Sequence, residues 1–404
     1  MDRSRPPRVC IITTDPSGDA VGGALAAALQ RRGPVELIGA GGAAMREAGV
    51  ELLCDTTAWT ALGAVSWAHV LAQAIPGSHV FRWEVNRRKP DLLVPIDSGG
   101  FNVPVTRTLR RWLGVPALYY IPPRSWSRQW TVTPLKVADY VAAPFPWNLE
   151  GDDGTGRVRF VGHPAADLPV TVAPQAEARR QLGLDDGLPV LALLPGSRRF
   201  ELRAHLPLVA QAVCQLRKEL PGLQVVVGRA SSVAPERLAT QLVQVGLAAA
   251  AVVEGAPRAL RAADAALVCF GTATLEACVL GCPMVPFYRL TPLMALEFRL
   301  LHRRPRWFAL PNIVADREIV PELQHEGVTP ERLARDAGRL LGDGQARAQQ
   351  RARLLEAAQV LGPPGAAERA AQAVLDVLNG EWHAAQGAAE GPGTHSSRVT
   401  AATA

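Results

Sequence analysis

A buried-type strand that ends in a proline–glycine turn constrains the fold of this chain most. The run from Val190 to Leu194 has the length and the apolar composition of a strand that is covered on both faces. It stops at Pro195-Gly196 and continues through Ser197 and Arg198 into a helical pattern. In a parallel α/β sheet, such a turn presents backbone N–H groups at the start of a helix, where a phosphate binds. The segment therefore predicts an α/β fold with an anion site at Gly196, Ser197 and Arg198.

A second turn of the same kind follows about 75 residues later in the chain. Here Gly271, Thr272 and Ala273 come directly after an apolar run and precede a helical pattern that contains Glu276. Two turns that combine glycine with a hydroxyl residue in one half of the chain indicate a site for a nucleotide diphosphate.

Short apolar strands alternate with helical segments along most of the chain, which predicts parallel sheets of the doubly wound kind. The first series of predicted strands lies at 8–13, 35–38, 91–96, 116–121, 140–143 and 158–161. The second series lies at 190–194, 223–227, 250–253, 265–268 and 283–287, with helices at 201–219, 235–246 and 273–281. We therefore expect two Rossmann-like domains that face a cleft.

The expected domains are 1–170 and 171–344, with a closing C-terminal helix over 345–380. The residues 381–404 are rich in Ala, Gly, Ser and Thr without an apolar period, which predicts a disordered tail.

Composition excludes several classes of protein. The six cysteines are scattered and form no CxxC pair, so we expect reduced thiols in a cytoplasmic protein and no metal site. The N-terminus leads directly into a strand, so we expect no signal peptide, and no apolar run is long enough to span a bilayer. A net charge of +6 suits anionic partners, but no nucleic-acid-binding motif accompanies it.

Short motifs spread over about 8–341 resemble the lipid-A-disaccharide synthase family of glycosyltransferases. In chain order they are Ser17-Gly18-Asp19, Gly41-Gly42 with Met45, Pro90-Asp91, Ile96-Asp97, Phe101-Asn102, Trp126, Phe160-Val161-Gly162-His163-Pro164, Leu193-Leu194-Pro195-Gly196-Ser197-Arg198, Gly271-Thr272-Ala273-Thr274-Leu275-Glu276, Pro283-Met284-Val285 with Tyr288-Arg289, and Leu310-Pro311-Asn312 with Arg317-Glu318. Each motif is weak alone, but their order and spacing together are specific.

The resemblance implies a two-domain fold of the GT-B type and a defined reaction. UDP-2,3-diacylglucosamine would donate its sugar to 2,3-diacylglucosamine 1-phosphate, with inversion, and UDP would be released. No metal and no cofactor are implied. The alternatives are a related UDP-sugar transferase or an epimerase with another substrate, and a non-catalytic relative that binds nucleotide or membrane.

Asp97 is the expected general base, because it ends a buried strand and a carboxylate there can accept the proton of the acceptor hydroxyl. Its alternative role is to cap the turn before Gly99. Arg198 is expected to stabilise the leaving diphosphate, and otherwise is a surface arginine.

The remaining expected site residues divide between nucleotide and acceptor. Gly196, Ser197, Gly271, Thr272, Ala273, Glu276 and Asn312 are expected on the nucleotide side. Ser17, Gly18, Asp19, Asn102 and Trp126 are expected on the acceptor side. Glu276 could instead be a carboxylate that the helix dipole favours near the N-terminus of its helix, Asn312 could be a turn or cap residue, and Trp126 could be a core residue.

Lipid substrates imply contact with the inner face of the cytoplasmic membrane, while the oligomeric state stays open. The segment 290–307 mixes apolar residues with arginines, and we expect membrane contact at Arg299, Arg303, Arg304 and Trp307. The apolar region 59–83 is a second candidate, for acyl chains. Either region could instead be an amphipathic helix packed on the core.

The chain departs from the family pattern at Gly100, Arg124, Arg128, Phe270 and Asp316, and in the first turn, where Thr14-Asp15-Pro16 replaces Gly-Glu-Ala. Arg128 stands where the family has a second tryptophan, and Phe270 replaces a small residue before the second turn. The changes on the acceptor side leave the exact lipid substrate open.

Overall fold

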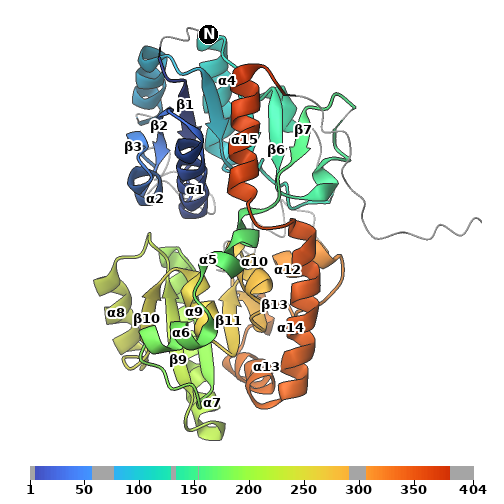
Figure 1. Ribbon diagram of the computed structural model, residues 1–404. Helices are drawn as coiled ribbons and strands as arrows, with labels where there is room; N and C mark the ends of the chain where they lie inside the picture. Colours follow the sequence, from blue (N-terminus) through green and yellow to red (C-terminus); the bar gives the residue numbers. More distant parts are fainter. Residues whose placement is uncertain (1–4, 57–76, 129–132, 153, 291–305, 383–404) are drawn as a thin grey trace, which may run out of the picture.

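The computed structural model describes residues 5–56, 77–128, 133–152, 154–290 and 306–382. It has two lobes, each built on a parallel sheet (Figure 1). Among the described residues, no helix combines the length and the apolarity that crossing a bilayer requires.

Among the described residues, the first lobe has seven parallel strands in the order β3-β2-β1-β4-β5-β6-β7. Two isolated bridges, Leu93–Ala117 and Ile96–Tyr120, join the part that ends in β4 to the part that begins with β5. The strands are β1 (Arg8–Ile12), β2 (Glu36–Gly41), β3 (Glu51–Asp55), β4 (Leu92–Pro95), β5 (Leu118–Tyr120), β6 (Tyr140–Ala143) and β7 (Val158–Phe160). The helices of this lobe are α1 (Pro16–Arg32), α2 (Ala43–Glu47), a helix over 77–88, α4 (Gly99–Leu113) and α15 (Ala366–Asn379).

In the second lobe, the part of the chain that the structure describes forms six parallel strands in the order β10-β9-β8-β11-β12-β13. The strands are β8 (Val190–Leu194), β9 (Gln224–Arg229), β10 (Ala251–Glu254), β11 (Ala265–Cys269), β12 (Met284–Tyr288) and β13 (Leu323–Gln324). The helices are α5 (Leu168–Thr171), α6 (Gln175–Gln181), α7 (Arg199–Glu219), α8 (Pro235–Gln244), α9 (Ala256–Ala262), α10 (Thr272–Leu280), α12 (Leu310–Ala315), α13 (Pro330–Gly342) and α14 (Gly344–Ala358).

Helices cover both faces of each sheet, which explains the uninterrupted apolar strands. In β8, Val190, Ala192 and Leu194 pack in one core cluster with α9, α10 and α14. Leu191 and Leu193 point the other way, into a cluster with α7, α8 and α13. Because successive side chains of a strand alternate between faces, every residue of β8 is buried.

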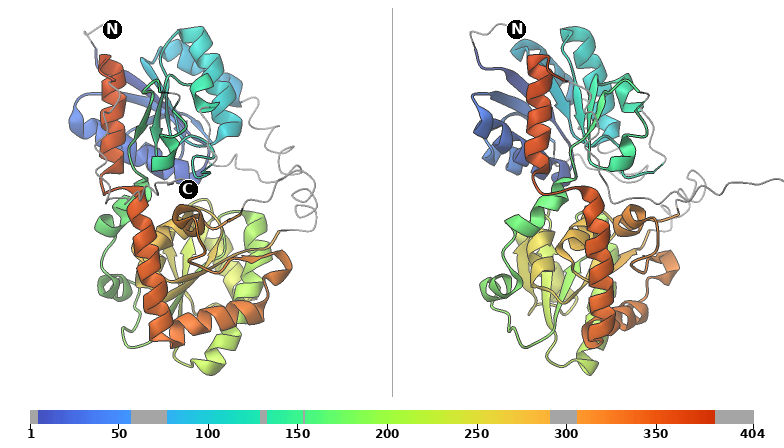
Figure 2. Two further views of the ribbon diagram at one scale, coloured as in Figure 1. Left: turned by 90° about the vertical axis from the view of Figure 1, so that its right-hand side faces the viewer. Right: turned by 45° about the vertical axis from the view of Figure 1, so that its right-hand side comes forward.

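The last part of the chain corrects the prediction of one closing helix over 345–380. It forms two helices on different lobes: α14 lies on the second lobe and α15 packs on α1 of the first (Figures 1 and 2). Pro363 and Pro364 separate them, together with Gly362 and Gly365, whose φ angles are +85° and +95°. Of the predicted tail, 383–404 lies outside the described residues, whereas the indole N–H of Trp382 donates to the Gly156 carbonyl at 2.9 Å.

The chain passes between the lobes twice, and the two crossings are tied together. The Arg369 guanidinium donates to the carbonyls of Val161 (2.8 Å) and Pro364 (2.9 Å), and Asp167 accepts the backbone N–H of Gly365. β7 ends immediately before the first crossing, so the carboxyl ends of the first sheet lie at the junction. Figure 1 shows α7, which follows β8, running from the junction to the far end of the second lobe.

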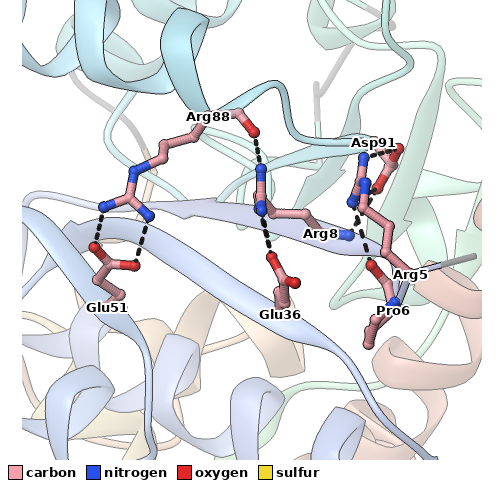
Figure 3. Close-up of polar contacts among 7 residues, drawn as sticks. All are labelled: Arg5, Pro6, Arg8, Glu36, Glu51, Arg88 and Asp91. Carbon is pink, nitrogen blue, oxygen red and sulfur yellow. Dashed lines mark hydrogen bonds and ion pairs between the residues drawn. The ribbon is translucent and has the colours of Figure 1, made fainter.

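Ion pairs join the strands at the opposite, amino edge of the first sheet (Figure 3). Arg5 pairs with Asp91 at 3.0 Å, the Arg8 guanidinium bonds to Glu36, and the Arg88 guanidinium bonds to Glu51. The Arg8 side chain also donates to the Arg88 carbonyl. These contacts connect β1, β2 and β3 to the helix over 77–88 on the side away from the junction.

Candidate functional site

Asp97 follows β4 in a backbone conformation that its neighbours hold in place. Asp97 and Ser98 have φ angles of +51° and +43°, in the left-handed region that non-glycine residues rarely adopt. The Asn102 amide donates to the carbonyls of Ile96 (2.7 Å) and Asp97 (2.9 Å), and the Tyr119 hydroxyl donates to the Asp97 carbonyl at 2.8 Å. Asn102 is completely buried. The side chain expected to contact the acceptor therefore shapes the turn that presents Asp97.

The environment of Asp97 raises its pKa to about 6. Burial is the larger cause, and the nearby Asp15 carboxylate adds to it. Asp15 accepts a hydrogen bond from the Ser98 hydroxyl, which accepts one in turn from the Thr14 hydroxyl at 2.6 Å. Two carboxylates thus face the turn from two neighbouring strands, and one of them titrates near neutral pH, as a general base requires.

The Ser17-Gly18-Asp19 motif is mainly structural in this fold. The Asp19 carboxylate accepts the backbone N–H groups of Gly42 (2.7 Å), Ala44 (2.9 Å) and Met45 (3.2 Å), which caps the start of α2. A Cβ at Gly18 would lie 2.0 Å from the Thr13 hydroxyl oxygen. Of the three, only Ser17 is exposed. The buried Asp19 carboxylate therefore holds the second βα connection.

The Glu201 carboxylate accepts hydrogen bonds from the turn after β8, and the sequence motifs did not indicate this residue as part of the site. One carboxylate oxygen, Oε2, accepts the backbone N–H groups of Ser197 (2.8 Å) and Arg198 (3.1 Å). The other, Oε1, accepts from Nη1 of Arg198 (3.0 Å) and from the Tyr288 hydroxyl (3.2 Å). Glu201 is 3% exposed. The two backbone donors expected to be free for phosphate are therefore already used.

What this turn leaves for a ligand is the Ser197 hydroxyl and part of the Arg198 guanidinium. Nε of Arg198 is buried without a hydrogen-bond partner. Gly196 is required because its φ is +127° and a Cβ would lie 2.5 Å from the Cβ of Glu201. The sequence did contain a signal, since Glu201 stands three residues after the N-cap Arg198, the spacing of a capping box.

His205, one helical turn after Glu201, ties this turn to the end of β12. Its Nδ1 lies 2.7 Å from the Pro195 carbonyl oxygen, and its Nε2 accepts the backbone N–H of Arg289 at 3.2 Å. Burial lowers the pKa of His205. A neutral ring with the proton on Nδ1 satisfies both contacts.

The second turn opens α10 and presents a carboxyl group without a protein partner. Gly271 has a φ of +140°, and Gly271 and Thr272 are exposed at the start of the helix. Burial raises the pKa of Glu276 to about 7, and none of the described residues bonds to its carboxyl group. The Phe270 ring lies between the rings of Tyr288 and Phe308, at centroid distances of 6.2 and 6.1 Å. The enlarged side chain at this position thus packs beside the turn.

Asn312, expected on the nucleotide side, bonds to the loop that follows α12. Its Oδ1 accepts the backbone N–H groups of Ile319 (2.7 Å) and Val320 (3.0 Å), and its Nδ2 donates to Glu322 at 3.0 Å. The side chain is completely buried. These hydrogen bonds hold the loop after α12 in place.

Arg128 joins the loop that carries Trp126 to the second lobe. It donates from Nε to the Ile313 carbonyl at 3.2 Å and from Nη2 to the Val314 carbonyl at 2.8 Å, both near the C-terminus of α12. Its guanidinium also lies 4.6 Å from the ring centroid of Trp147. Trp126 is 37% exposed, so it is not a fully buried core residue.

The expected membrane residues are described only in part. Arg299, Arg303 and Arg304 lie outside the described residues, as does the apolar segment 57–76. Trp307 is half-buried beneath the Arg306 guanidinium, which is 5.3 Å from its ring centroid. Among the described residues, no group of three His, Cys, Asp or Glu side chains could hold a metal ion.

Comparisons with known proteins agree along nearly the whole chain. The family model described as lipid-A-disaccharide synthetase matches residues 9–377. The chain is 35% identical to the lipid-A-disaccharide synthase of Trichlorobacter lovleyi over 384 residues, which is 94% of this chain and 99% of the relative. It is 34% identical to that of Myxococcus xanthus over 380 residues, with 93% and 98% covered.

Solved structures confirm the predicted class of fold. MnaA of S. aureus, solved with UDP, matches with a TM-score of 0.62 at 15% identity, covering 92% of this chain and 97% of that one. The calicheamicin glycosyltransferase CalG4 matches with a TM-score of 0.57 at 17% identity, covering 93% and 99%. Two α/β lobes of the GT-B kind are thus common to this chain and these enzymes.

Proposed function

The chain belongs to the lipid-A-disaccharide synthetase family, and from this we propose its reaction and the residues that perform it. It transfers the sugar of UDP-2,3-diacylglucosamine to 2,3-diacylglucosamine 1-phosphate. The products are a β-1,6-linked, acylated disaccharide 1-phosphate and UDP. The observation that supports this assignment most is the family match over residues 9–377, which includes both lobes and both candidate turns.

Asp97 acts as the general base of this displacement. Its carboxylate accepts the proton of the acceptor hydroxyl while that oxygen attacks the anomeric carbon. The bond from the anomeric carbon to the UDP oxygen breaks on the opposite face, which inverts the configuration. A pKa of about 6 leaves the carboxylate mostly charged at neutral pH and yet a useful proton acceptor.

Arg198 and the turn of α10 stabilise the charge that develops on UDP. The exposed part of the Arg198 guanidinium, whose side chain is 29% exposed, and the Ser197 hydroxyl face the ligand side of the first turn. The N–H groups of Gly271, Thr272 and Ala273 at the start of α10 are available on the second. One well-placed donor of this kind is worth about 3–4 kcal/mol in the transition state. Glu276, whose carboxyl group bonds to none of the residues that the structure describes, accepts hydrogen bonds from the ribose hydroxyls.

The lipid substrates place the enzyme at the inner face of the cytoplasmic membrane as a peripheral protein. The acyl chains of both sugars need an apolar environment, and a bilayer supplies it. Ser17 and Trp126 are the exposed members of the expected acceptor side, and they remain our candidates for contacts with the acceptor.

A transfer assay with purified protein tests this proposal. The two lipid substrates are dispersed in detergent, and the acylated disaccharide 1-phosphate is detected by mass spectrometry. Asp97→Asn is expected to abolish product, because the amide cannot accept the proton. Asp186→Asn, in an exposed loop of the second lobe, is the matched control and is expected to behave as the wild type. Absence of disaccharide from folded, UDP-binding wild-type protein would overturn the acceptor assignment and favour a related transferase or an epimerase.

A further inference from the structure

The outer face of the first lobe exposes tryptophans beside arginines. The helix over 77–88 and α4 pack on the same face of the sheet through Phe81 and Leu109 (Figure 2). On their outer side, Val80 is 59% exposed and Trp83 is 60% exposed. Trp112, at the end of α4, is 52% exposed. Trp83 and Trp112 are the two most exposed tryptophans among the described residues, so burial of their rings does not explain why these positions carry tryptophan.

A basic cavity of about 500 Å³ lies at the C-terminal end of α4. Four cations line it, Arg107, Arg110, Arg111 and Lys136, with Asp139 as the single acid. The negative charge of Asp139 is compensated within the protein, because its carboxylate bonds to the Arg110 guanidinium and accepts the Ala117 N–H at 2.9 Å.

The other three cations of the cavity have no acidic partner among the residues that the structure describes. α4 contains no acidic residue from Gly99 to Leu113. The partial negative charge at a helix C-terminus explains a preference for arginine at 110 and 111. It explains neither Lys136, which comes from another segment, nor the exposed indole of Trp112. Three cations without an acidic partner around one cavity give it a positive potential, which favours an external anion.

We propose that this surface, here called the basic aromatic face and formed by Val80, Trp83, Arg107, Arg111, Trp112 and Lys136, docks the protein on an anionic phospholipid bilayer. A lipid phosphate occupies the cavity between Arg107, Arg111 and Lys136. The indole rings of Trp83 and Trp112 insert at the level of the headgroups. The proposal rests on the proposed function only in that lipid substrates bring the enzyme to a bilayer.

The chemistry of the face favours a bilayer over other anionic partners. Indole rings are enriched at membrane–water interfaces, because they combine an apolar body with a polar N–H group. Each basic residue held near an anionic surface contributes about a fivefold gain in binding. The helix over 77–88 and α4 pack in one core cluster on the same face of the sheet, so the exposed tryptophans and arginines on their outer sides face the same side of the lobe.

Vesicle sedimentation with the full chain tests the proposal. The probes are vesicles of phosphatidylcholine alone and vesicles that also contain phosphatidylglycerol. We expect the wild type to bind only the anionic vesicles. Replacing Arg107, Arg111 and Lys136 together by Gln is expected to weaken this binding roughly a hundredfold, as three fivefold effects. Trp83→Ser with Trp112→Ser is expected to weaken it as well.

The matched control removes three exposed charges from the second lobe, Lys218, Arg237 and Arg353, also by Gln. This variant is expected to bind vesicles as the wild type does. The Arg107, Arg111 and Lys136 variant is expected to keep full transfer activity on detergent-dispersed substrates, which separates docking from catalysis. Equal loss of binding in both charge variants would overturn the proposal, since net charge alone would then account for it. Loss of activity in detergent would also overturn it and assign the cavity to the acceptor.

Discussion

Glu201→Gln is the substitution that most directly tests how the turn after β8 is held. The carboxylate accepts four donors, two on each oxygen, from Ser197, Arg198 and Tyr288. A glutamine amide has one acceptor oxygen, and its NH₂ group can only donate. In either orientation of the amide, two of the four donors face another donor. The shape of the side chain is preserved, so the change isolates hydrogen bonding and charge from packing.

The expected magnitudes follow from this count. A buried donor left without an acceptor costs about 1–3 kcal/mol, so two cost roughly 2–6 kcal/mol. The Tyr288 hydroxyl can rotate and accept, which relieves part of one conflict. We therefore expect the free energy of unfolding to fall by about 2–4 kcal/mol. Displacement of the Arg198 guanidinium by about 1 Å is expected to lower kcat about a hundredfold. KM for the UDP-sugar is expected to change much less, because Arg198 acts on charge that develops in the transition state.

Steady-state kinetics with the UDP-sugar varied, alongside urea denaturation, measures both effects. Tyr288→Phe is the matched control, since it removes one of the four donors and leaves Arg198 bonded to Glu201. Gly196→Ala disturbs the same turn from its other side, where a Cβ would lie 2.5 Å from that of Glu201. A Glu201→Gln enzyme with wild-type kcat would refute the reasoning, whatever its stability.

Three further predictions concern residues near the junction of the lobes. The acid limb of kcat/KM is expected near pH 6, because the protonated Asp97 cannot accept the hydroxyl proton. In a pH–rate profile, Asp15→Asn is expected to move this limb to lower pH. An unmoved limb would contradict the role of Asp15. Because the pKa of Asp97 is raised on folding from its ordinary 3.8, its charge opposes folding as pH rises through about 6, and Asp97→Asn is expected to unfold at higher urea than the wild type at pH 8. Arg128→Ala removes both hydrogen bonds to α12, so the lobes are expected to separate more readily. Small-angle scattering detects this as a larger radius of gyration. An unchanged radius and an unchanged proteolysis pattern would show that the two bonds do not restrain the lobes.

Much of the fold was predictable because its signals are local. The five apolar residues of β8 imply a strand covered on both faces, and the structure buries all five. The positive φ angles of Gly196 and Gly271 agree with turns at the ends of β8 and β11. The resemblance led to Asp97, and the structure shows a raised pKa at that position.

Three predicted site residues have partners inside the protein that the sequence did not reveal. Asn102, Asp19 and Asn312 lie in family motifs, yet their polar groups bond to backbone inside the protein. A motif indicates that a polar residue is needed, but it does not distinguish a side chain that holds a loop from one that contacts a ligand. Glu201 was missed for the converse reason, because its spacing indicated only a helix cap.

The sequence by itself determined the parallel α/β class and the two strand–turn–helix units, because each depends on residues within a few positions of one another. Only the tertiary structure decided what depends on distant segments. Glu201 meets Tyr288 across 87 positions, Arg128 meets the end of α12 across 185, and α15 returns to α1 of the first lobe. Such contacts form when sheets and lobes assemble, and no local pattern of residues encodes which partner each side chain will meet.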